Sequence, residues 1–189
     1  MQELRLTSPI PPSVNHYLAY RVISKAGRPM AMSYKTKEAK DYQKAFTAYV
    51  QEEAEKQGWS LNENKFQHYY VDCYFYFDRT DKDANNYMKC SLDAITDAGC
   101  VWIDDTQVCE RVQRIVYDSQ NPRIEFVIRP VEYVGIFDNE ADLKEFTERC
   151  KTCPRYQRNC SILNKSLEGR IIPDVVNGTC LKFKFKEKK

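Results

Sequence analysis

One stretch of 31 residues in the middle of the chain holds seven aspartates and two lysines, of which Lys89 is the one well placed for chemistry. Four of these acids form two close sets, Asp81 with Asp83 and Asp104 with Asp105. Carboxylate oxygens are the ligands that Mg²⁺ prefers, and bound Mg²⁺ polarises a phosphodiester and activates water. A lysine beside such a site stabilises the negative charge of the transition state. The pattern therefore predicts a Mg²⁺ site for phosphodiester hydrolysis.

The segment between the two acidic sets has helical periodicity, with Met88, Leu92 and Ile95 on one face and Gly99 at its end. A helix of about 14 residues is about 20 Å long, which separates the two sets. They can meet if the strand after Asp105 pairs beside the strand that precedes the helix, which would return Asp105 toward the first set. The sequence permits this pairing and does not require it.

Each of these residues also fits an ordinary structural role. Asp81 and Asp83 suit the first turn of a helix, where the helix dipole favours negative charge. Asp104 and Asp105 are residues typical of turns, and Lys89 can be a solvated surface charge. A metal site and a purely structural pattern both remain open at this point.

A second group of residues with chemical potential lies near the C-terminus. Cys150, Cys153, Cys160 and Cys180 have the spacing C-x2-C-x6-C-x19-C. Four thiolates bind Zn²⁺ tetrahedrally or hold an iron–sulfur cluster, and a segment of about 40 residues buries too little core to fold without such support. We expect Zn²⁺ at this cluster, with an iron–sulfur cluster and free thiols as alternatives.

Composition limits the class of protein. The 189 residues carry a net charge of +2, and no run of 18 apolar residues or apolar leader is present, which predicts a cytoplasmic globular protein. The other cysteines, Cys73, Cys90, Cys100 and Cys109, are expected to be buried as small apolar side chains. Positive charge gathers late in the chain, in residues that we expect to face DNA phosphates, together with the basic end KFKFKEKK. These residues are Arg155, Arg158 and Lys165, with Lys89 as a further DNA contact near the acids.

The elements that must position these residues follow an order of strand, helix, strand, helix, strand, strand, which predicts an α+β, or mixed α/β, fold. Ser33 or Thr36 can begin the first long helix and Gly58 ends it. The segment HYYVDCYFYF alternates as a strand with one buried face. We expect a main domain over residues 1–132, a linker with a short helix over 133–149, and a small metal-stapled module over 150–189.

Three motifs in order give a more specific indication. They are LTSPIPPSVNHYLAY near the N-terminus, DANNYMKCSLDAITDAG in the centre and VWIDDTQV after it. Together they resemble the RusA-type Holliday junction resolvases, a family common in prophages. The match covers roughly residues 4–130, and the family pattern does not include the cysteine cluster.

The resemblance implies a set of catalytic residues. In the family, the two aspartates of a D-x-D-N-x-x-K motif and the second aspartate of a D-D-x-Q turn gather the metal, and the lysine is needed for catalysis. Aligned without gaps, these positions are Asp83, Asn85, Asp105 and Lys89. Asn85 thus stands where the family has its second aspartate. An amide oxygen can bind Mg²⁺ but brings no negative charge and cannot act as a general base.

Three explanations of Asn85 are open. A shifted register would make Asp81 and Asp83 the acidic pair, but it requires two inserted residues before Lys89. The chain can be a naturally weakened homologue, or Asn85 can be an inactivating replacement. We favour the last two over the shift.

The resemblance also implies a function. We expect a Mg²⁺-dependent endodeoxyribonuclease that resolves Holliday junctions in recombination and repair, acting as a homodimer. The alternative is a catalytically silent protein of the same fold that binds branched DNA. A zinc-stapled regulatory module, with an acidic cluster of no function, is the third hypothesis.

Overall fold

The computed structural model describes residues 2–25 and 27–185 and divides the chain into two compact units. The first unit comprises Met1–Lys65 and Tyr69–Pro130, and the second comprises Phe66–His68 and Val131–Lys189. The last four residues of the basic end, 186–189, lie outside the described residues. No helix in the described part of the chain is long and apolar enough to cross a membrane.

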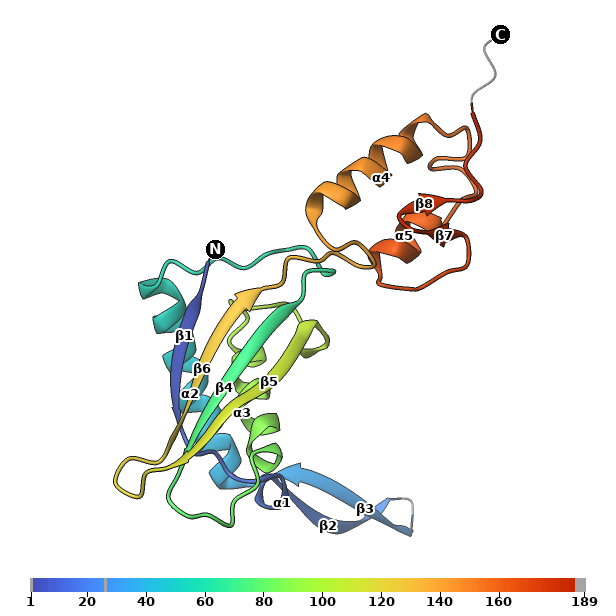
Figure 1. The fold of residues 1–189 in the computed structure, drawn as a ribbon. Helices are drawn as coiled ribbons and strands as arrows, with labels where there is room; N and C mark the ends of the chain where they lie inside the picture. The colour runs from blue at the N-terminus through green and yellow to red at the C-terminus, as the bar shows by residue number, and fades with distance from the viewer. Residues whose placement is uncertain (1, 26, 186–189) are drawn as a thin grey trace. The chain divides into compact units, whose positions relative to one another are not determined.

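The first unit is built on a mixed four-stranded sheet (Figure 1). Its strand order is β1-β6-β4-β5, in which β4 and β5 are parallel and the other neighbours are antiparallel. The parallel pair needs a crossover, which α3 provides. The expectation of a mixed α+β fold is confirmed. The elements of this unit are β1 (Leu4–Pro9), α1 (Val14–Tyr17), β2 (Leu18–Lys25), β3 (Arg28–Lys35), α2 (Lys37–Lys56), β4 (Tyr69–Phe77), α3 (Asn85–Asp97), the 3-10 turn η1 (Asp105–Gln107), β5 (Val108–Tyr117) and β6 (Arg123–Pro130).

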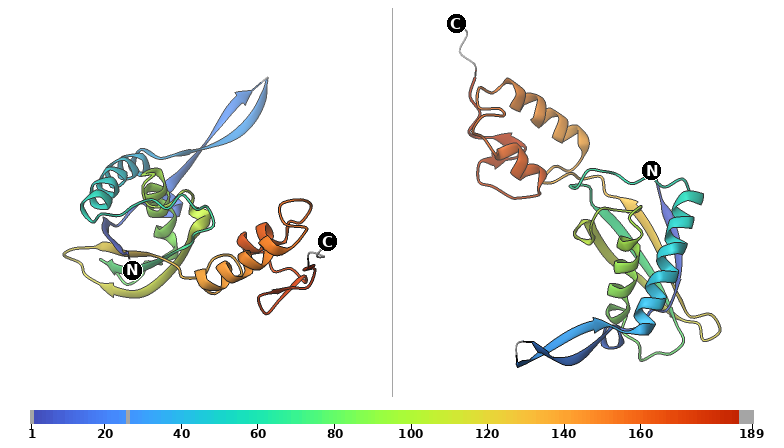
Figure 2. Two further views of the ribbon diagram at one scale, coloured as in Figure 1. Left: turned by 90° about the horizontal axis from the view of Figure 1, so that it is seen from above. Right: turned by 180° about the vertical axis from the view of Figure 1, so that it is seen from behind.

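The core of this unit lies between the sheet and the helices α2 and α3, which cover the same face (Figure 2). Strand β4 alternates, so that Phe75 and Phe77 are fully buried on the helix side. From α2, Phe46 and Val50 pack against them, and Ile95 does so from α3. Removing one such buried aromatic side chain costs about 3–5 kcal/mol, so this layer fixes the position of α3 on the sheet.

The other face of the sheet is polar, and its centre is Asp72 on β4, which is 3% exposed. Arg111 Nε and Gln113 Nε2 each donate to this carboxylate at 2.7 Å, and Arg129 Nη2 donates at 2.8 Å. Burial alone would raise the pKa of Asp72, but the hydrogen bonds from Arg111 and Gln113 and the nearby arginine charges lower it below its ordinary value. A buried carboxylate is thus fully paired in the middle of this face.

A two-stranded hairpin, β2–β3, extends from the first unit (Figure 1). It is not among the expected elements, because its strands carry no buried face that would give a clear alternation of apolar and polar residues. Tyr20 and Val22 are each 74% exposed. Gly27 lies at the turn with a φ of +75°, a conformation that glycine adopts without strain.

The helix α2 begins where the sequence predicts. Thr36 is its N-cap and its side-chain oxygen accepts a hydrogen bond from Ala39 N at 3.2 Å.

Of the four cysteines expected to be buried, Cys73 and Cys90 are buried, whereas Cys100 and Cys109 are partly exposed. That part of the expectation is wrong, because these two residues lie in a loop beside the core and on the edge strand β5.

The second unit is small and contains α4 (Glu140–Thr152), α5 (Ile162–Leu167) and a minimal pair of strands, β7 (Val175–Val176) and β8 (Thr179–Cys180). Its main hydrophobic cluster contains three buried side chains, Phe137, Phe146 and Ile162. Two of the three come from the segment expected as a linker with a short helix. At Gly135, with φ +60°, an added Cβ would lie 2.0 Å from Ser166 O, so the close packing of this turn requires glycine.

Candidate active site

The loop after β4 carries the first set of candidate residues. Asn85 is the first residue of α3, and its backbone N–H donates to Asp83 Oδ1 at 3.0 Å. Both side chains are exposed, so their oxygens can reach a ligand from solvent. Asp81 is engaged differently, because both of its oxygens accept hydrogen bonds from Arg79. Asp83 and Asn85 are therefore the available oxygen donors at this helix start.

Lys89 lies one helical turn after Asn85 on the same side of α3. Its Nζ is 3.1 Å from Asp93 Oδ1, and Asp93 also accepts a hydrogen bond from Tyr17 Oη. Burial, followed by this hydrogen bond, raises the pKa of Tyr17 well above its ordinary value, so it donates as a neutral phenol. Asp93 and Tyr17 thus orient Lys89. Lys89 and Asp93 are four residues apart on a helix, and this spacing alone predicts from the sequence that their side chains meet.

The N-terminal motif reaches the same end of the sheet. Strands β1 and β4 both run antiparallel to β6, so they run in the same direction and their C-terminal ends lie together. Pro9 pairs with Arg123, which also pairs with Tyr76 near the end of β4. The turn after β1 then leads into α1, which contacts α3. Two of the three motifs are therefore side by side.

The third motif lies at the opposite end. The strand after Asp105 does pair beside β4, but the pair is parallel, with Tyr69 opposite Val108 and Phe77 opposite Tyr117. Asp105 therefore lies beside the beginning of β4, whereas Asp83 follows its end. Because β4 has nine residues, the two ends are about 26 Å apart. Convergence of Asp105 and Asp83 by strand pairing, which the sequence permits, does not occur within one chain.

The two acids of this third motif have different local roles. Asp104 is the N-cap of η1, and its Oδ1 accepts a hydrogen bond from Thr106 N at 2.9 Å. The hydrogen bonds from Thr106 lower the pKa of Asp104. Gln107 is buried and its Oε1 accepts from Ile103 N at 2.8 Å, which closes the turn. Asp105 is exposed, as is Asp104, so this turn presents two acids to solvent.

Residues 9–129 match the family model of endodeoxyribonuclease RusA, a range that holds the second and third motifs and the first motif from Pro9 onward. The chain belongs to the RusA endodeoxyribonuclease family. Membership makes it a Holliday junction resolvase by family, and RusA nucleases use Mg²⁺. A search of curated proteins finds no match for the chain.

The oxygen donors at the start of α3 suit Mg²⁺ in kind. A carboxylate and an amide oxygen, both exposed, are hard ligands of the type that Mg²⁺ binds together with water. The number of such donors is small. Within residues 2–25 and 27–185, the structure arranges no group of three or more His, Cys, Asp or Glu side chains to hold a metal ion. The aspartate that would complete the set, Asp105, is at the other end of the sheet.

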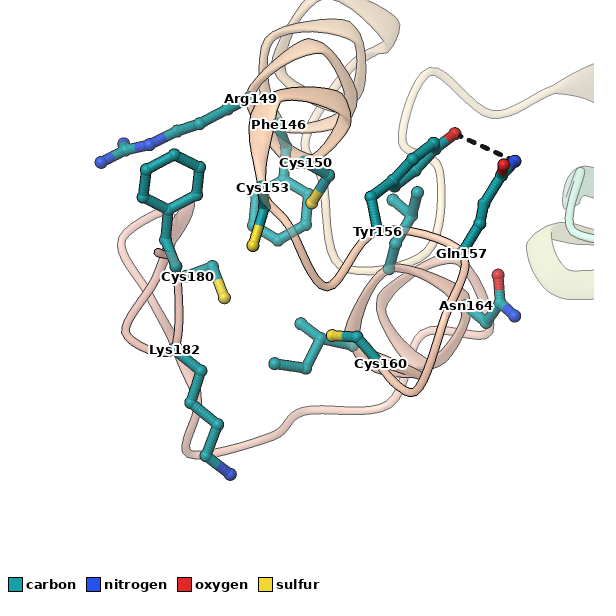
Figure 3. Close-up of a pocket in the computed structure, with 13 residues that line it drawn as sticks. Phe146, Arg149, Cys150, Cys153, Tyr156, Gln157, Cys160, Asn164, Cys180 and Lys182 are labelled. Carbon is teal, nitrogen blue, oxygen red and sulfur yellow. Dashed lines mark hydrogen bonds between the residues drawn. The ribbon is translucent and has the colours of Figure 1, made fainter. Parts of the chain in front are cut away.

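The four late cysteines line one cavity of about 140 Å³ in the second unit (Figure 3). Burial, and then the proximity of the other three cysteines, raises the pKa of Cys150 to about 11. Burial alone would raise the pKa of Cys153, but hydrogen bonds from the backbone N–H groups of Arg155 and Lys184 lower it. The side chains as placed are not arranged to hold an ion, so the expected metal staple is not confirmed.

The basic residues expected to contact DNA belong to both units. Lys89 is exposed on α3 of the RusA domain. In the second unit, Arg158 and Lys165 are exposed and Arg155 is partly exposed. These positions leave all four cations accessible to a phosphate.

Proposed function

We propose that this RusA-family protein nicks Holliday junctions at the start of α3 with Mg²⁺, as part of DNA recombination and repair. One observation carries the proposal: Asp83 and Asn85 begin the helix and Lys89 follows one turn later, on the end of the sheet where the N-terminal motif also lies. Bound Mg²⁺ would polarise the scissile phosphate and lower the pKa of its water ligand. Lys89, held by Asp93, supplies positive charge for the transition state.

Asn85 limits this activity. It occupies the family's second aspartate position, where a carboxylate would add one negative charge to the metal site. The amide keeps the shape of the helix start and one oxygen donor but removes that charge. Metal affinity and cleavage rate both fall as a result, while DNA binding is preserved. This holds whether Asn85 is natural or an inactivating replacement.

We further propose that the active form is a homodimer in which each site takes Asp105 from the second chain. Strand β5 is an edge of the sheet, with backbone groups ready to pair with another strand. Its side chains Val112, Ile115 and Tyr117 are 42–55% exposed, which is unusual for apolar residues on neighbouring positions of one strand. A second copy of β5 would cover them.

The geometry of such a dimer brings the separated acids together. A two-fold axis through the middle of β5 makes an antiparallel pair, in which Val108 of one chain lies opposite Tyr117 of the other. Asp105, three residues before Val108, then lies beside the end of β5 in the second chain. Because strands are about 4.8 Å apart, the end of β4, which leads to Asp83, is about 10 Å from Val108 of the second chain across two strand spacings, in place of the ~26 Å within one chain.

The symmetry of this arrangement suits the substrate. A Holliday junction has approximate two-fold symmetry, and its resolution requires two symmetric nicks. A dimer with one two-fold axis presents two equivalent sites, each built from both chains. Neither chain alone would then cut, which prevents a single unpaired nick.

The C-terminal module adds contacts to the DNA backbone. We place the RusA domain in residues 1–132, the connection in 133–149 and the added module in 150–189. Arg155, Arg158 and Lys165 would bind phosphates outside the catalytic site, and Lys89 would bind one within it. Such contacts increase affinity without reading the DNA sequence.

The test is cleavage of a synthetic four-way junction, with duplex DNA of the same sequences as the control substrate. We expect nicks that require Mg²⁺ and that disappear in Asp83→Asn, with junction binding unchanged. The second candidate function, a silent protein that binds branched DNA, is favoured by Asn85. It predicts tight junction binding in the absence of any Mg²⁺-dependent nicking, including in Asn85→Asp.

A further inference from the structure

The cysteine cavity in the second unit brings together residues from three separate segments. Cys150 lies in the last turn of α4 and Cys153 follows that helix, Cys160 precedes α5, and Cys180 is in β8. Their sulfur atoms point into one shared space (Figure 3). Residues up to 30 positions apart in the sequence therefore converge at a single point of the unit.

These cysteines are less buried than Cys73 and Cys90 of the first unit, and all four are partly exposed. Cys150, Cys160 and Cys180 also pack against the small core of the second unit. Packing alone does not require a thiol, and it does not account for four thiols around one cavity. All eight cysteines are present as free thiols, so no disulfide joins the three segments.

The second unit has few other means of holding its elements together. Its main hydrophobic cluster contains three buried side chains, and the strand pair in its described residues has two residues in each strand. A unit of this size usually requires a disulfide or a metal for stability. The cavity lies where α4, the turn before α5 and the β7–β8 pair meet, so a ligand bound there would connect all three.

The backbone around Cys153 is arranged as in metal-binding turns. Cys153 N donates to Cys150 O at 3.0 Å and Tyr156 N donates to Cys153 O at 3.1 Å, which forms a tight turn around the C-x2-C pair.

We propose that Cys150, Cys153, Cys160 and Cys180 bind a four-thiolate metal centre, of the class that comprises Zn²⁺ and the [4Fe–4S] cluster. Each thiol releases its proton to solvent as its sulfur binds, so four thiolates replace four thiols. Rotation about the single sp³ torsion of each side chain moves the sulfurs within the cavity, from their present placement to one that coordinates.

The first experiment measures metal in the full-length wild-type protein, purified without oxygen or chelator. We expect about one Zn per chain, or about four Fe and four sulfide per chain with visible charge-transfer absorption. Either result supports the centre and identifies its metal. The proposal is overturned if no stoichiometric metal is found, either as purified or after reconstitution with Zn²⁺ or with iron and sulfide. Two disulfides in the purified protein would also overturn it.

The second experiment uses the variants Cys160→Ala and Cys180→Ala, with Cys100→Ala in the first unit as the matched control. Loss of a direct ligand should lower metal affinity by more than the ~10–100-fold typical of an outer-shell change. Cys100→Ala should retain the wild-type metal content. Because a variant can lose metal by misfolding, hydrogen exchange is also measured on the wild-type protein before and after chelation.

Chelation should speed exchange in α4, α5 and β7–β8 and leave the β1-β6-β4-β5 sheet unchanged. Unchanged exchange throughout, or unchanged metal content in both ligand variants, would contradict the proposal. None of these measurements involves DNA cleavage, so their outcome is independent of the nuclease site.

Discussion

Asp83 and Asp105 lie at opposite ends of the parallel strand pair β4–β5, although the resemblance to the RusA motifs implies one metal site for both. The distance follows from the crossover helix α3, which returns the chain to the starting edge of the sheet before β5 begins. In the dimer that we propose, a two-fold axis through β5 would bring Asp83 of one chain and Asp105 of the other together in each of two sites.

Mixing two inactive chains tests the shared site directly. Asp83→Asn and Asp105→Asn, each made in an Asn85→Asp background, should both be inactive as homodimers. In a mixed dimer, one site carries both changes and the other carries neither. In a random mixture, about a quarter of all active sites should therefore be intact. This fraction is measured as nicks in a four-way junction.

The control for this complementation is a mixture of two differently tagged Asp83→Asn chains, which should remain inactive. If the Asp83→Asn and Asp105→Asn mixture also remains inactive while mixed dimers are shown to form, both aspartates act within one chain. The proposal of a shared site would then fail.

The dimer edge is tested by a charge at the centre of β5. Val112→Lys places a cation near its own symmetry mate, and like charges at an interface oppose association. The Kd of dimerisation should rise by about tenfold or more, which corresponds to ~1.4 kcal/mol. Sedimentation velocity over a range of protein concentrations measures this change.

Thr7→Lys on β1, at the other edge of the same sheet, is the matched control. It should leave dimerisation unchanged, because β1 is not part of the proposed contact. Dissociation by Thr7→Lys combined with none by Val112→Lys would place the interface on the opposite edge.

The sequence predicts the elements that carry a strong periodic pattern. Strand β4, with its buried alternate residues, and helix α3, with Met88, Leu92 and Ile95 inward, lie where their patterns indicate. The hairpin β2–β3 is not predictable in this way, since its exposed strands bury no continuous face. Periodicity reports burial, and an element without a buried side gives little periodicity.

The sequence predicts only the part of the candidate site that lies in one continuous segment. The turn containing Asp83, Asn85 and Lys89 is a continuous segment, so its own sequence places these three residues on one helix start. The position of Asp105 depends on whether β5 pairs in a parallel or an antiparallel direction, which is a property of the whole sheet. The pairing of Lys89 with Asp93 follows from helical spacing, but the hydrogen bond from Tyr17 to Asp93 requires tertiary contact.

Asp72 should make stability depend on pH. Its pKa in the folded protein is lowered, so the stabilisation that it provides is present above its unfolded pKa of about 3.9 and is lost as pH falls through the folded value. Asp72→Asn should lower the free energy of unfolding at pH 7 by about 1.5–3 kcal/mol, since three charge-assisted contacts are lost. Urea unfolding measures this difference, which should shrink at pH values below about 4.

Asp97→Asn is the control, because Asp97 is exposed at the end of α3 and should change stability by less than about 0.5 kcal/mol. A constant difference between wild type and Asp72→Asn from pH 7 to pH 3 would show that the charge of Asp72 is not the source of the stabilisation.

Asn85→Asp should increase Mg²⁺-dependent cleavage of a four-way junction, on the order of 10²-fold, because it restores a charged metal ligand at the start of α3. Junction affinity without metal should not increase, since an added negative charge does not attract DNA. Asn86→Asp is the matched control. It introduces the same charge one residue later on the same helix and should give no comparable gain. If Asn85→Asp also gives no gain while Asp81→Asn abolishes an existing activity, Asp81 and Asp83 form the acidic pair, and the gapless assignment of Asn85 to the metal site is wrong.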